Sequence, residues 1–363
     1  MSRSIIVTVV GARPQFVKAA PLCRALRRRF REVLVHTGQH YDAEMSAAFF
    51  DELAIPEPDY NLGIGSGSHG RMTGRMLEAL EGVLRQVEPV MVVVLGDTNS
   101  TLAGALAAAK LGIPVAHVEA GLRSFDARMP EEINRRLTDH VSALLLCPTP
   151  TAVANLKAEG ITRGVHRVGD VMMDAVLQNL ERARRRVPGA SRRALPEPRS
   201  YYLATLHRQE NVDDAYRLRS IMGALSELPH PTLMPLHPRT RKRLRGTGFH
   251  GRDAVTLRSP ASYLEMLLLV RGARAVLTDS GGLQKEAFIL GTPCVTLRET
   301  TEWVETVEAG ANRLVGADAR RIVRAVRAVE RRPKRVRSGR LYGDGHAAER
   351  IAGLIDRFLR ARR

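Results

Sequence analysis

Short, continuous apolar runs alternate along the chain with longer segments in which apolar residues recur at helical spacing. In the first half, the apolar runs predict strands over Ile5–Val10, Val33–His36, Val90–Leu95, Val115–Val118 and Leu144–Leu146. The segments between them predict helices, among them Phe16–Phe30, Ser68–Gln86 and Thr98–Lys110. Continuous β-branched and apolar runs are typical of parallel strands that are buried on both faces of a sheet.

The second half repeats this alternation. Its apolar runs predict strands over Tyr201–Thr205, Thr232–Leu236, Ala254–Leu257, Ala275–Thr278 and Cys294–Leu297. Helices are predicted over Ala215–Leu228, Tyr263–Arg271 and Gly282–Leu290. One sheet rarely holds so many strands, so the pattern predicts an α/β protein with two doubly wound, Rossmann-like domains. We expect the two domains to face a central cleft that is lined by the carboxyl ends of their strands.

Two segments lie outside this alternation. The stretch Glu181–Arg199 combines prolines, a glycine and many charges, which favours a surface crossing between the domains. The last residues, Gly345–Arg363, carry Ile351, Leu354, Ile355, Phe358 and Leu359 on one side and predict an amphipathic helix.

The chain has 363 residues and a formal net charge of +18. Only six of its 56 basic residues are lysine, and the basic residues are spread over the whole chain. The densest run, Arg331–Arg340, has no aromatic residues for base stacking. We therefore expect no nucleic-acid partner.

Cysteine use and hydropathy indicate the cellular compartment in which we expect the protein. Cys23, Cys147 and Cys294 lie far apart, which argues against a disulfide scaffold and fits a reducing compartment. No apolar run is long enough to span a membrane. The first residues, Met1–Val10, lack the layout of a signal peptide. We therefore expect a cytoplasmic protein without a membrane partner.

Two glycine-containing turns after predicted strands are candidate anion sites. Gly11 ends the first strand and is followed by Arg13 and Lys18, so the turn is either a phosphate site or a solvated strand-to-helix connection. Ser280-Gly281-Gly282 follows another strand and begins a helix, an arrangement that can bind a diphosphate through backbone N–H groups. Glu286 lies one helical turn further and could accept ribose hydroxyls.

Acidic residues and histidines also follow strands or lie in adjacent loops. Asp97, Glu119 and Glu131 could converge, in which case their repulsion would raise at least one pKa and suit proton transfer. The alternative for each is a helix cap or a surface ion pair. His207 and His237 follow strands of the second half and could contact phosphate or act as acids, although a single such histidine is more often structural.

Two further patterns do not predict a cofactor. Gly65, Gly67 and Gly70 match GxGxxG, but we expect no strand before them, so the stretch indicates a loop that opens a helix rather than a dinucleotide site. His36 and His40 have HxxxH spacing without the glutamate of a zinc-protease helix, and we expect no metal.

Taken together and in order, seven motifs resemble one family. They are Gly11-Ala12-Arg13-Pro14-Gln15, Gly38-Gln39-His40, Gly96-Asp97-Thr98, His117-Val118-Glu119-Ala120-Gly121-Leu122-Arg123, Pro130-Glu131-Glu132-Ile133-Asn134-Arg135, Thr278-Asp279-Ser280-Gly281-Gly282-Leu283-Gln284 and Tyr342-Gly343-Asp344-Gly345. The chain is similar over nearly its whole length to the non-hydrolysing UDP-N-acetylglucosamine 2-epimerases.

The resemblance implies a fold, a reaction and a set of residues. The fold would be of the glycosyltransferase-B type, with an N-terminal domain of residues 1–170 plus 346–363 and a UDP-binding domain of residues 171–345. The reaction would interconvert UDP-GlcNAc and UDP-ManNAc by UDP elimination and re-addition with inversion at C2, without cofactor or metal. The enzyme would be a homodimer. The implied catalytic residues are Asp97, Glu119, Glu131 and His207. The implied substrate-binding residues are Arg13, Lys18, Arg135, His237, Ser280, Gly281, Gly282 and Glu286.

The chain also departs from the family pattern. Thr301-Glu302-Trp303-Val304-Glu305 stands where members that act on UDP-GlcNAc usually carry Thr-Glu-Arg-Pro-Glu, and Trp303 supplies no guanidinium. Arg208-Gln209 replaces two arginines, and Tyr41–Glu44 replaces a glutamine-rich stretch of the activator site. Here the chain resembles the branch that epimerises UDP-2,3-diacetamido-2,3-dideoxyglucuronate. That sugar and a retaining UDP-sugar glycosyltransferase activity remain as alternatives.

Overall fold

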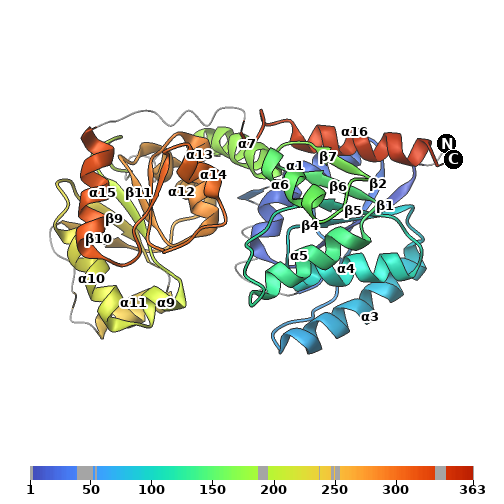
Figure 1. Ribbon diagram of the computed structural model, residues 1–363, viewed down its shortest axis with the longest axis horizontal. Helices are drawn as coiled ribbons and strands as arrows, with labels where there is room; N and C mark the ends of the chain where they lie inside the picture. Colours follow the sequence, from blue (N-terminus) through green and yellow to red (C-terminus); the bar gives the residue numbers. More distant parts are fainter. Residues whose placement is uncertain are drawn as a thin grey trace. The chain divides into compact units, whose positions relative to one another are not determined.

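The chain forms two compact units (Figure 1). Unit 1 comprises Met1–Gln178 and Arg340–Arg363, and unit 2 comprises Asn179–Gly339. The computed structural model describes residues 3–38, 52–53, 55–186, 195–236, 238–246, 249, 254–331 and 341–362. Each unit is built around one parallel sheet with helices on both faces.

Unit 1 holds a seven-stranded sheet of order β3-β2-β1-β4-β5-β6-β7. Its strands are β1 (Ile5–Val10), β2 (Arg31–His36), β3 (Tyr60–Asn61), β4 (Met91–Leu95), β5 (Val115–Val118), β6 (Leu144–Cys147) and β7 (Val165–Arg167). Its helices are α1 (Arg13–Arg27), α3 (His69–Val87), α4 (Asn99–Lys110), α5 (Pro130–Val141), α6 (Pro150–Ala158) and α16 (Ala347–Arg360). All neighbouring strands run parallel, as the continuous apolar runs predict.

Unit 2 holds a six-stranded parallel sheet of order β10-β9-β8-β11-β12-β13. Its strands are β8 (Tyr202–Thr205), β9 (Thr232–Pro235), β10 (Val255–Arg258), β11 (Val276–Thr278), β12 (Cys294–Thr296) and β13 (Asn312–Leu314). Its helices are α9 (Gln209–Val212), α10 (Ala215–Ser226), α11 (Pro238–Arg245), α12 (Tyr263–Gly272), α13 (Gly281–Leu290), α14 (Val304–Glu308) and α15 (Ala319–Arg331).

Alternate side chains of the strands bury opposite faces of the sheet. In β8, Tyr202 and Ala204 join one hydrophobic cluster together with residues of α10 and α15. Leu203, between them, joins a second cluster with residues of α12 and α13. Burial on both faces explains why this strand has no polar alternation. The prediction of two doubly wound, Rossmann-like sheets is confirmed, whereas the expected central cleft stays a prediction.

Three strands have no counterpart in the predicted set. They are β3, β7 and β13, and each lies at an edge of its sheet. They are two or three residues long and carry polar, partly exposed side chains. Because β3 ends at Asn61, a strand does precede the glycine-rich stretch that begins at Gly65, contrary to our expectation. That stretch nevertheless leads into α3, with Ser68 at its N-cap position, as predicted.

The expected crossing at Glu181–Arg199 is wrong in its first part. Residues up to Arg186 belong to α7 (Val171–Arg186), a continuous helix that contains the division between the units. Its first half belongs to unit 1 because Asp174 accepts hydrogen bonds from the backbone N–H groups of Ala347 and Ala348 at the start of α16. The division therefore falls eight residues after the expected boundary at residue 170.

The C-terminal helix is confirmed as an amphipathic element of the first unit. Helix α16 packs against α1 and buries Ile351 and Ile355, while Leu354, Phe358 and Leu359 are partly exposed. Among the described residues, no helix combines the length and the apolar character that crossing a bilayer requires.

Both sheets share the strand order of a Rossmann fold, in which the connections reverse direction at the first strand. The reversal lies between β1 and β4 in unit 1 and between β8 and β11 in unit 2. Ligands of open α/β sheets bind beyond the carboxyl ends of the strands at such a point. We therefore expect each unit to bind its ligand at the loops that follow these strands.

Candidate active site

Charged side chains gather beyond the central strands of unit 1. Asp97 follows β4, Glu119 follows β5, and Lys18 lies on α1. Lys18 Nζ donates to Glu119 Oε2 at 2.5 Å. Arg135, from α5, donates to the carboxylate of Asp97. The structure thus joins four of the residues singled out in the sequence into two ion pairs at the point where the sheet reverses direction.

The two ion pairs influence each other's proton affinity. Burial raises the pKa of Asp97, the charge of Glu119 adds to this, and the charges of Arg135 and Lys18 oppose it without cancelling it. Burial alone would lower the pKa of Lys18, but the charge and hydrogen bond of Glu119 outweigh it, so that pKa is raised. The sequence predicts that repulsion between the carboxylates raises the pKa of at least one of them. The pKa of Asp97 is raised, and burial contributes more to this shift than the charge of Glu119.

Glu119 lies in a strained turn. Its φ of 73° falls in the left-handed region, which is uncommon for residues other than glycine. Two residues later, Gly121 has a φ of 78°, and a Cβ atom there would lie 2.3 Å from the carbonyl oxygen of Ala152. Backbone strain of this kind persists only where the surrounding structure holds it, and it concentrates at functional sites.

This geometry predicts a stability loss for Gly121→Ala. We expect the free energy of unfolding to fall by about 1–3 kcal/mol because alanine both clashes with the Ala152 carbonyl and strains the backbone. Urea denaturation followed by circular dichroism measures it. The control is Gly82→Ala, at an exposed position of α3 with open space around the new methyl group, which should gain about 0.5–1 kcal/mol. Equal stability of the Gly121 variant and the wild type would show that position 121 tolerates a Cβ atom, contrary to the clash described for it.

The first turn of α5 carries two glutamates with different surroundings. Glu132 is buried and accepts hydrogen bonds from the Ser124 backbone N–H at 2.8 Å, the Ser124 hydroxyl at 2.9 Å and Arg135 at 3.2 Å. Glu131 is partly exposed, and no hydrogen bond or ion pair joins its side chain to another described residue. The contacts therefore tie Glu132 to the cluster, and the catalytic role of Glu131 stays a prediction.

The turn after β1 differs from both interpretations drawn from the sequence. The backbone N–H groups of Gly11 and Ala12 donate to Gln15 Oε1 at 2.8 and 2.9 Å, so they are not available to a phosphate. Both residues are buried, so the turn is not a solvated connection either. The Arg13 side chain lies outside the part of the chain that the structure describes. Of the expected anion-binding groups here, Lys18 is the one whose position is defined.

A histidine–aspartate pair lies at the corresponding point of unit 2. His207 follows β8, Asp279 follows β11, and His207 Nδ1 lies 2.9 Å from Asp279 Oδ1. Asp279 also accepts from the backbone N–H of Arg208 at 3.1 Å and from Asn211 Nδ2 at 3.2 Å. Burial alone would raise the pKa of Asp279, but these hydrogen bonds and the proximity of His207 outweigh it and lower that pKa. The pair holds Nδ1 towards Asp279, and no hydrogen bond between described residues uses Nε2 of the half-exposed ring.

The glycine pair at the start of α13 has available backbone donors. Ser280 is the N-cap residue, and its hydroxyl accepts from the Leu283 N–H at 3.4 Å. No hydrogen bond within the described chain uses the N–H groups of Gly281 or Gly282. Free N–H groups at the positive end of a helix dipole are suited to binding a phosphate. This turn, unlike the one after β1, retains the features of an anion site.

Trp303, in the loop after β12, contacts the turn at Gly281. Its indole N–H donates to the Gly281 carbonyl at 2.9 Å, and Lys285 Nζ lies 3.8 Å from the centre of the Trp303 ring. Glu302 packs so close to Gly281 that a Cβ atom there would lie 2.0 Å from its carboxylate, and Arg298 pairs with Glu302 at 2.9 Å. The indole therefore stabilises the backbone of the turn at Gly281. Position 303 provides no guanidinium to this turn.

Glu286 is buried on α13, and burial raises its pKa to about 7, against a smaller opposing effect of Tyr263. The folded protein therefore binds the Glu286 proton up to about pH 7, whereas the unfolded chain releases it near 4.5. The folded state binds more protons within this window, so stability is lost as the pH rises through it.

Glu286→Gln should remove this loss. We expect the variant to be more stable than the wild type by up to about 3 kcal/mol at about pH 8, with the difference vanishing near about pH 4.5. Denaturation curves across this pH range measure the effect, with Glu308→Gln, at an exposed glutamate of α14, as the matched control. Parallel pH profiles of the wild type and the Glu286 variant would contradict the assignment.

Several predicted positions fall outside the described residues or away from the clusters. His237, His40 and Tyr41–Glu44 lie outside the described part of the chain. His36 stacks on Phe16 with ring centres 5.0 Å apart and lies 3.3 Å from Asn61 Oδ1. Within the described ranges, no group of three histidine, cysteine or carboxylate side chains is placed to hold a metal. The three cysteines are free and buried.

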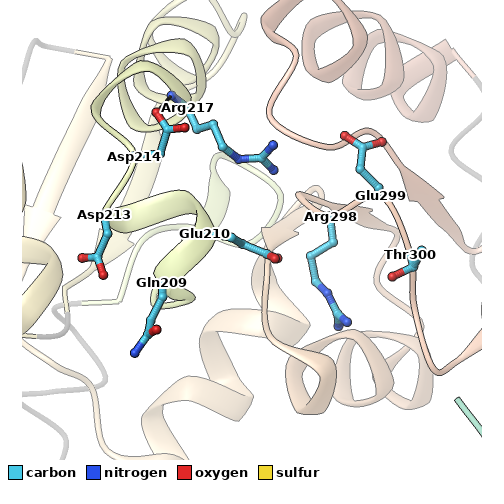
Figure 2. Close-up of a pocket in the computed structure, with 8 residues that line it drawn as sticks. All are labelled: Gln209, Glu210, Asp213, Asp214, Arg217, Arg298, Glu299 and Thr300. Atoms are coloured by element: carbon cyan, nitrogen blue, oxygen red, sulfur yellow. Dashed lines mark hydrogen bonds between the residues drawn. The ribbon is translucent and has the colours of Figure 1, made fainter. Parts of the chain in front are cut away.

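Unit 2 also contains an open pocket of about 780 Å³ between α9, α10 and the loop after β12. Figure 2 shows Glu210 and Arg217 reaching towards the loop that carries Arg298 and Glu299. None of the residues that we predicted for the site lines this pocket. The pocket nevertheless lies close to the candidate site, because α9 and the loop after β12 both follow the carboxyl ends of strands.

Two residues that organise the site were not predicted. Asp279 orients His207, and it stands directly after a strand, the same signal that selected Asp97. Asn134 Nδ2 donates to the Asp97 backbone carbonyl at 3.0 Å and to Asn99 Oδ1 at 3.2 Å. Asn134 lies inside a motif quoted for the resemblance, but its contact with a distant carbonyl has no signal in a single sequence.

Comparison with known proteins decides the family. The family model described as UDP-N-acetylglucosamine 2-epimerase matches residues 24–356. The chain belongs to the UDP-N-acetylglucosamine 2-epimerase family. The resemblance drawn from the motifs is thereby confirmed, and it extends over both units.

Three relatives show how close the match is. The chain is 51% identical to UDP-2,3-diacetamido-2,3-dideoxy-D-glucuronate 2-epimerase of Pseudomonas aeruginosa, with 96% of this chain and 98% of that protein covered. It is 49% identical to a UDP-N-acetylglucosamine 2-epimerase homolog of Methanococcus maripaludis, with 96% and 99% covered. The crystal structure of Methanocaldococcus jannaschii UDP-GlcNAc 2-epimerase in complex with UDP-GlcNAc and UDP aligns with a TM-score of 0.83 at 44% identity, covering 98% of this chain and 100% of that one.

Proposed function

We propose that the protein is a non-hydrolysing UDP-sugar 2-epimerase that interconverts UDP-GlcNAc and UDP-ManNAc. A base removes the C2 proton, the C1–O bond breaks, and UDP leaves with the bonding pair to give a 2-acetamidoglucal. UDP then adds back to C1 while a proton is delivered to C2 on the opposite face. The observation that carries the proposal is the pair of carboxylates, Asp97 and Glu119, that follow adjacent strands of a chain belonging to this family.

The residues of unit 2 suit the binding and release of UDP. The free N–H groups of Gly281 and Gly282 at the start of α13 suit the diphosphate, and Glu286 suits the ribose hydroxyls. His207, with Nδ1 fixed by Asp279, can donate a hydrogen bond or a proton from Nε2 to the departing phosphate. UDP is a poor leaving group unless its developing charge is stabilised, so these contacts lower the barrier to C1–O cleavage.

The residues of unit 1 suit proton transfer at C2. Inversion requires removal and return of a proton on opposite faces, hence more than one acid–base group. Asp97 and Glu119 supply two carboxyl groups, and Lys18, whose pKa is raised, stays a cation beside Glu119 and suits substrate binding. The raised pKa of Asp97 brings that group closer to neutrality, where a general acid or base works best. We propose Glu131 and Arg135 as further substrate-facing residues.

A specific observation supports a second candidate substrate, UDP-2,3-diacetamido-2,3-dideoxyglucuronate. Trp303 occupies the place at which UDP-GlcNAc enzymes usually carry arginine, and its indole is engaged with Gly281 and Lys285. The Pseudomonas aeruginosa protein named for that sugar is 51% identical to this chain. Trp303 is therefore the residue that supports this sugar as the alternative substrate.

The experiment is side-by-side turnover of both UDP-sugars, followed by proton NMR. The proposal predicts that at least one sugar converts to its C2 epimer without net UDP release. Preference for the diacetamido sugar would select the second candidate. Stoichiometric UDP release with glycoside formed on an added acceptor would identify a glycosyltransferase and reject the epimerase.

We also propose that the protein is a cytoplasmic homodimer. The family resemblance supports the dimer, and the free, buried cysteines support a reducing compartment. Light scattering coupled to size-exclusion chromatography tests the dimer, and a mass of 40.0 kDa in solution would reject it.

A further inference from the structure

His117, on β5, is a buried histidine with an acceptor at each ring nitrogen. Nδ1 lies 2.7 Å from Asp139 Oδ1, and Nε2 lies 2.7 Å from the backbone carbonyl oxygen of Gly96. Both the His117 and the Asp139 side chains are 0% exposed, so water cannot replace either partner. A carbonyl oxygen and a carboxylate oxygen both accept, so the two contacts are satisfied together only when both ring nitrogens carry hydrogen.

The charges around this histidine balance when the ring is an imidazolium. Asp139 Oδ2 accepts from Arg123 Nη1 at 2.7 Å, and Arg123 also forms two hydrogen bonds of 2.7 Å with Glu159. Burial alone would raise the pKa of Asp139, but His117 and Arg123 outweigh it and lower that pKa. Burial and Asp139 raise the pKa of the neighbouring Cys147 to about 12, so the thiol adds no charge. The imidazolium and Arg123 then face Asp139 and Glu159, and the more exposed Arg136 adds a longer contact of 4.0 Å to Glu159.

The His117–Asp139 pair contacts backbone groups close to Asp97 and to Glu119. His117 fixes the carbonyl of Gly96, whose φ is 67°, immediately before Asp97. Asn134 fixes the carbonyl of Asp97 itself at 3.0 Å, so the peptide groups on both sides of that residue are held. Asp139 also accepts from the Gly121 N–H at 3.1 Å, two residues after the strained Glu119.

We propose that His117 and Asp139 form a buried ion pair that positions both carboxylates of the site, Asp97 through the Gly96 carbonyl and Glu119 through the Gly121 amide. His117 touches neither reacting atom nor substrate in this proposal and is a positioning residue. The pair also links the ends of two adjacent strands, β4 and β5, to helix α5, so one interaction sets the spacing of the two groups. Its kinetic consequence rests on the proposed epimerase function, but its structural consequence does not.

The kinetic experiment compares His117→Gln with His140→Gln. His140 is exposed on α5, and its Nδ1 lies 2.8 Å from the Arg136 carbonyl oxygen. Glutamine carries both of its N–H donors on one nitrogen, so it cannot replace two ring nitrogens that donate to acceptors on different sides of the imidazole. We expect kcat per folded molecule to fall about 10–100-fold in His117→Gln, with KM for the UDP-sugar and Kd for UDP changed less than about twofold, because misplacement of reacting groups acts on the chemical step. His140→Gln should match the wild type. A purely structural histidine would lower the folded fraction and leave kcat per folded molecule unchanged, and that result would overturn the proposal.

A second measurement does not depend on activity. Nitrogen-15 NMR of histidine-labelled protein, with the His117 signal assigned by its loss in His117→Gln, should show both ring nitrogens protonated at neutral pH. Carbon-13 NMR of the Asp97 carboxyl should show its titration midpoint shifted by about half a pH unit or more in the variant. A ring with one bare nitrogen, or an unchanged Asp97 titration, would overturn the proposal even if the wild type turns over no UDP-sugar. Absence of turnover with both NMR results as expected would reject only the epimerase function.

Discussion

Asp97→Asn is expected to lower kcat by about 10²–10⁴-fold, the range that positioned acid–base groups contribute. The substitution keeps the shape of the side chain and its capacity to accept from Arg135, but it removes the transferable proton. Because the diphosphate is assigned to the turn at Gly281 and Gly282 in unit 2, the Kd for UDP should change less than about twofold. Initial rates by proton NMR and calorimetric titration with UDP measure the two quantities.

The matched control is Asp126→Asn. Asp126 pairs with Arg128 in an exposed loop of the same unit, so its amide should leave both quantities at the wild-type value. A fall in UDP affinity as large as the fall in kcat would show that Asp97 supports nucleotide binding. A kcat within a few-fold of the wild type would remove Asp97 from the chemistry.

His207→Gln should have a comparable effect for a different reason. Glutamine can keep the hydrogen bond to Asp279, but its amide cannot supply a proton where Nε2 does. We expect kcat to fall by about 10²–10³-fold. The loss should be largest for the step that expels UDP. Since the His207 side chain is 48% exposed, the free energy of unfolding should change by less than about 1 kcal/mol.

Two companions sharpen this test. Asp279→Asn leaves His207 in place but loses the ionised partner that sets its tautomer, so it should also reduce kcat, with an altered pH profile. His346→Gln, at an exposed histidine before α16, is the control and should retain full activity. Wild-type kcat in His207→Gln, with the protein folded, would contradict the role proposed for the histidine–aspartate pair.

The sequence pattern identifies central strands better than edge strands, and the reason is burial. Strand β4 is buried on both faces, and its sequence is one apolar run. Strands β3, β7 and β13 lie at the edges of their sheets and carry polar side chains such as Asn61 and His166. With two or three residues each, they give no period to detect. Their existence follows from the completed sheet and not from their own composition.

The candidate site was predictable to the extent that it depends on strand ends. Asp97, Glu119, His207 and Ser280 all follow strands, and parallel strands place such residues at one edge of a sheet. What the pattern could not provide is how polar groups pair across distant segments. Gln15 accepts from the two backbone N–H groups after β1, so these two groups are not available to an anion there.

The same limit applies to the choice between neighbouring residues. Glu131 and Glu132 are equivalent in a motif, but the helix they begin turns one towards Ser124 and Arg135 and leaves the other partly exposed. Likewise, the charge-rich stretch from Glu181 looks like a linker because it is polar, yet its first residues continue α7. Tertiary packing and not local composition decides both cases.

The most direct test of the account is the exchange of the C2 hydrogen with solvent. Purified protein is incubated with UDP-GlcNAc, and in parallel with the diacetamido-glucuronate sugar, in deuterium oxide, and C2 of both epimers is followed by NMR. Removal and return of a proton by different groups predicts that deuterium enters C2 of the product at the rate of epimerisation. Asp97→Asn should slow this entry by about the same 10²–10⁴-fold as kcat. Epimer formation with retention of the original hydrogen, or no deuterium in either sugar from folded protein, would contradict the central claim.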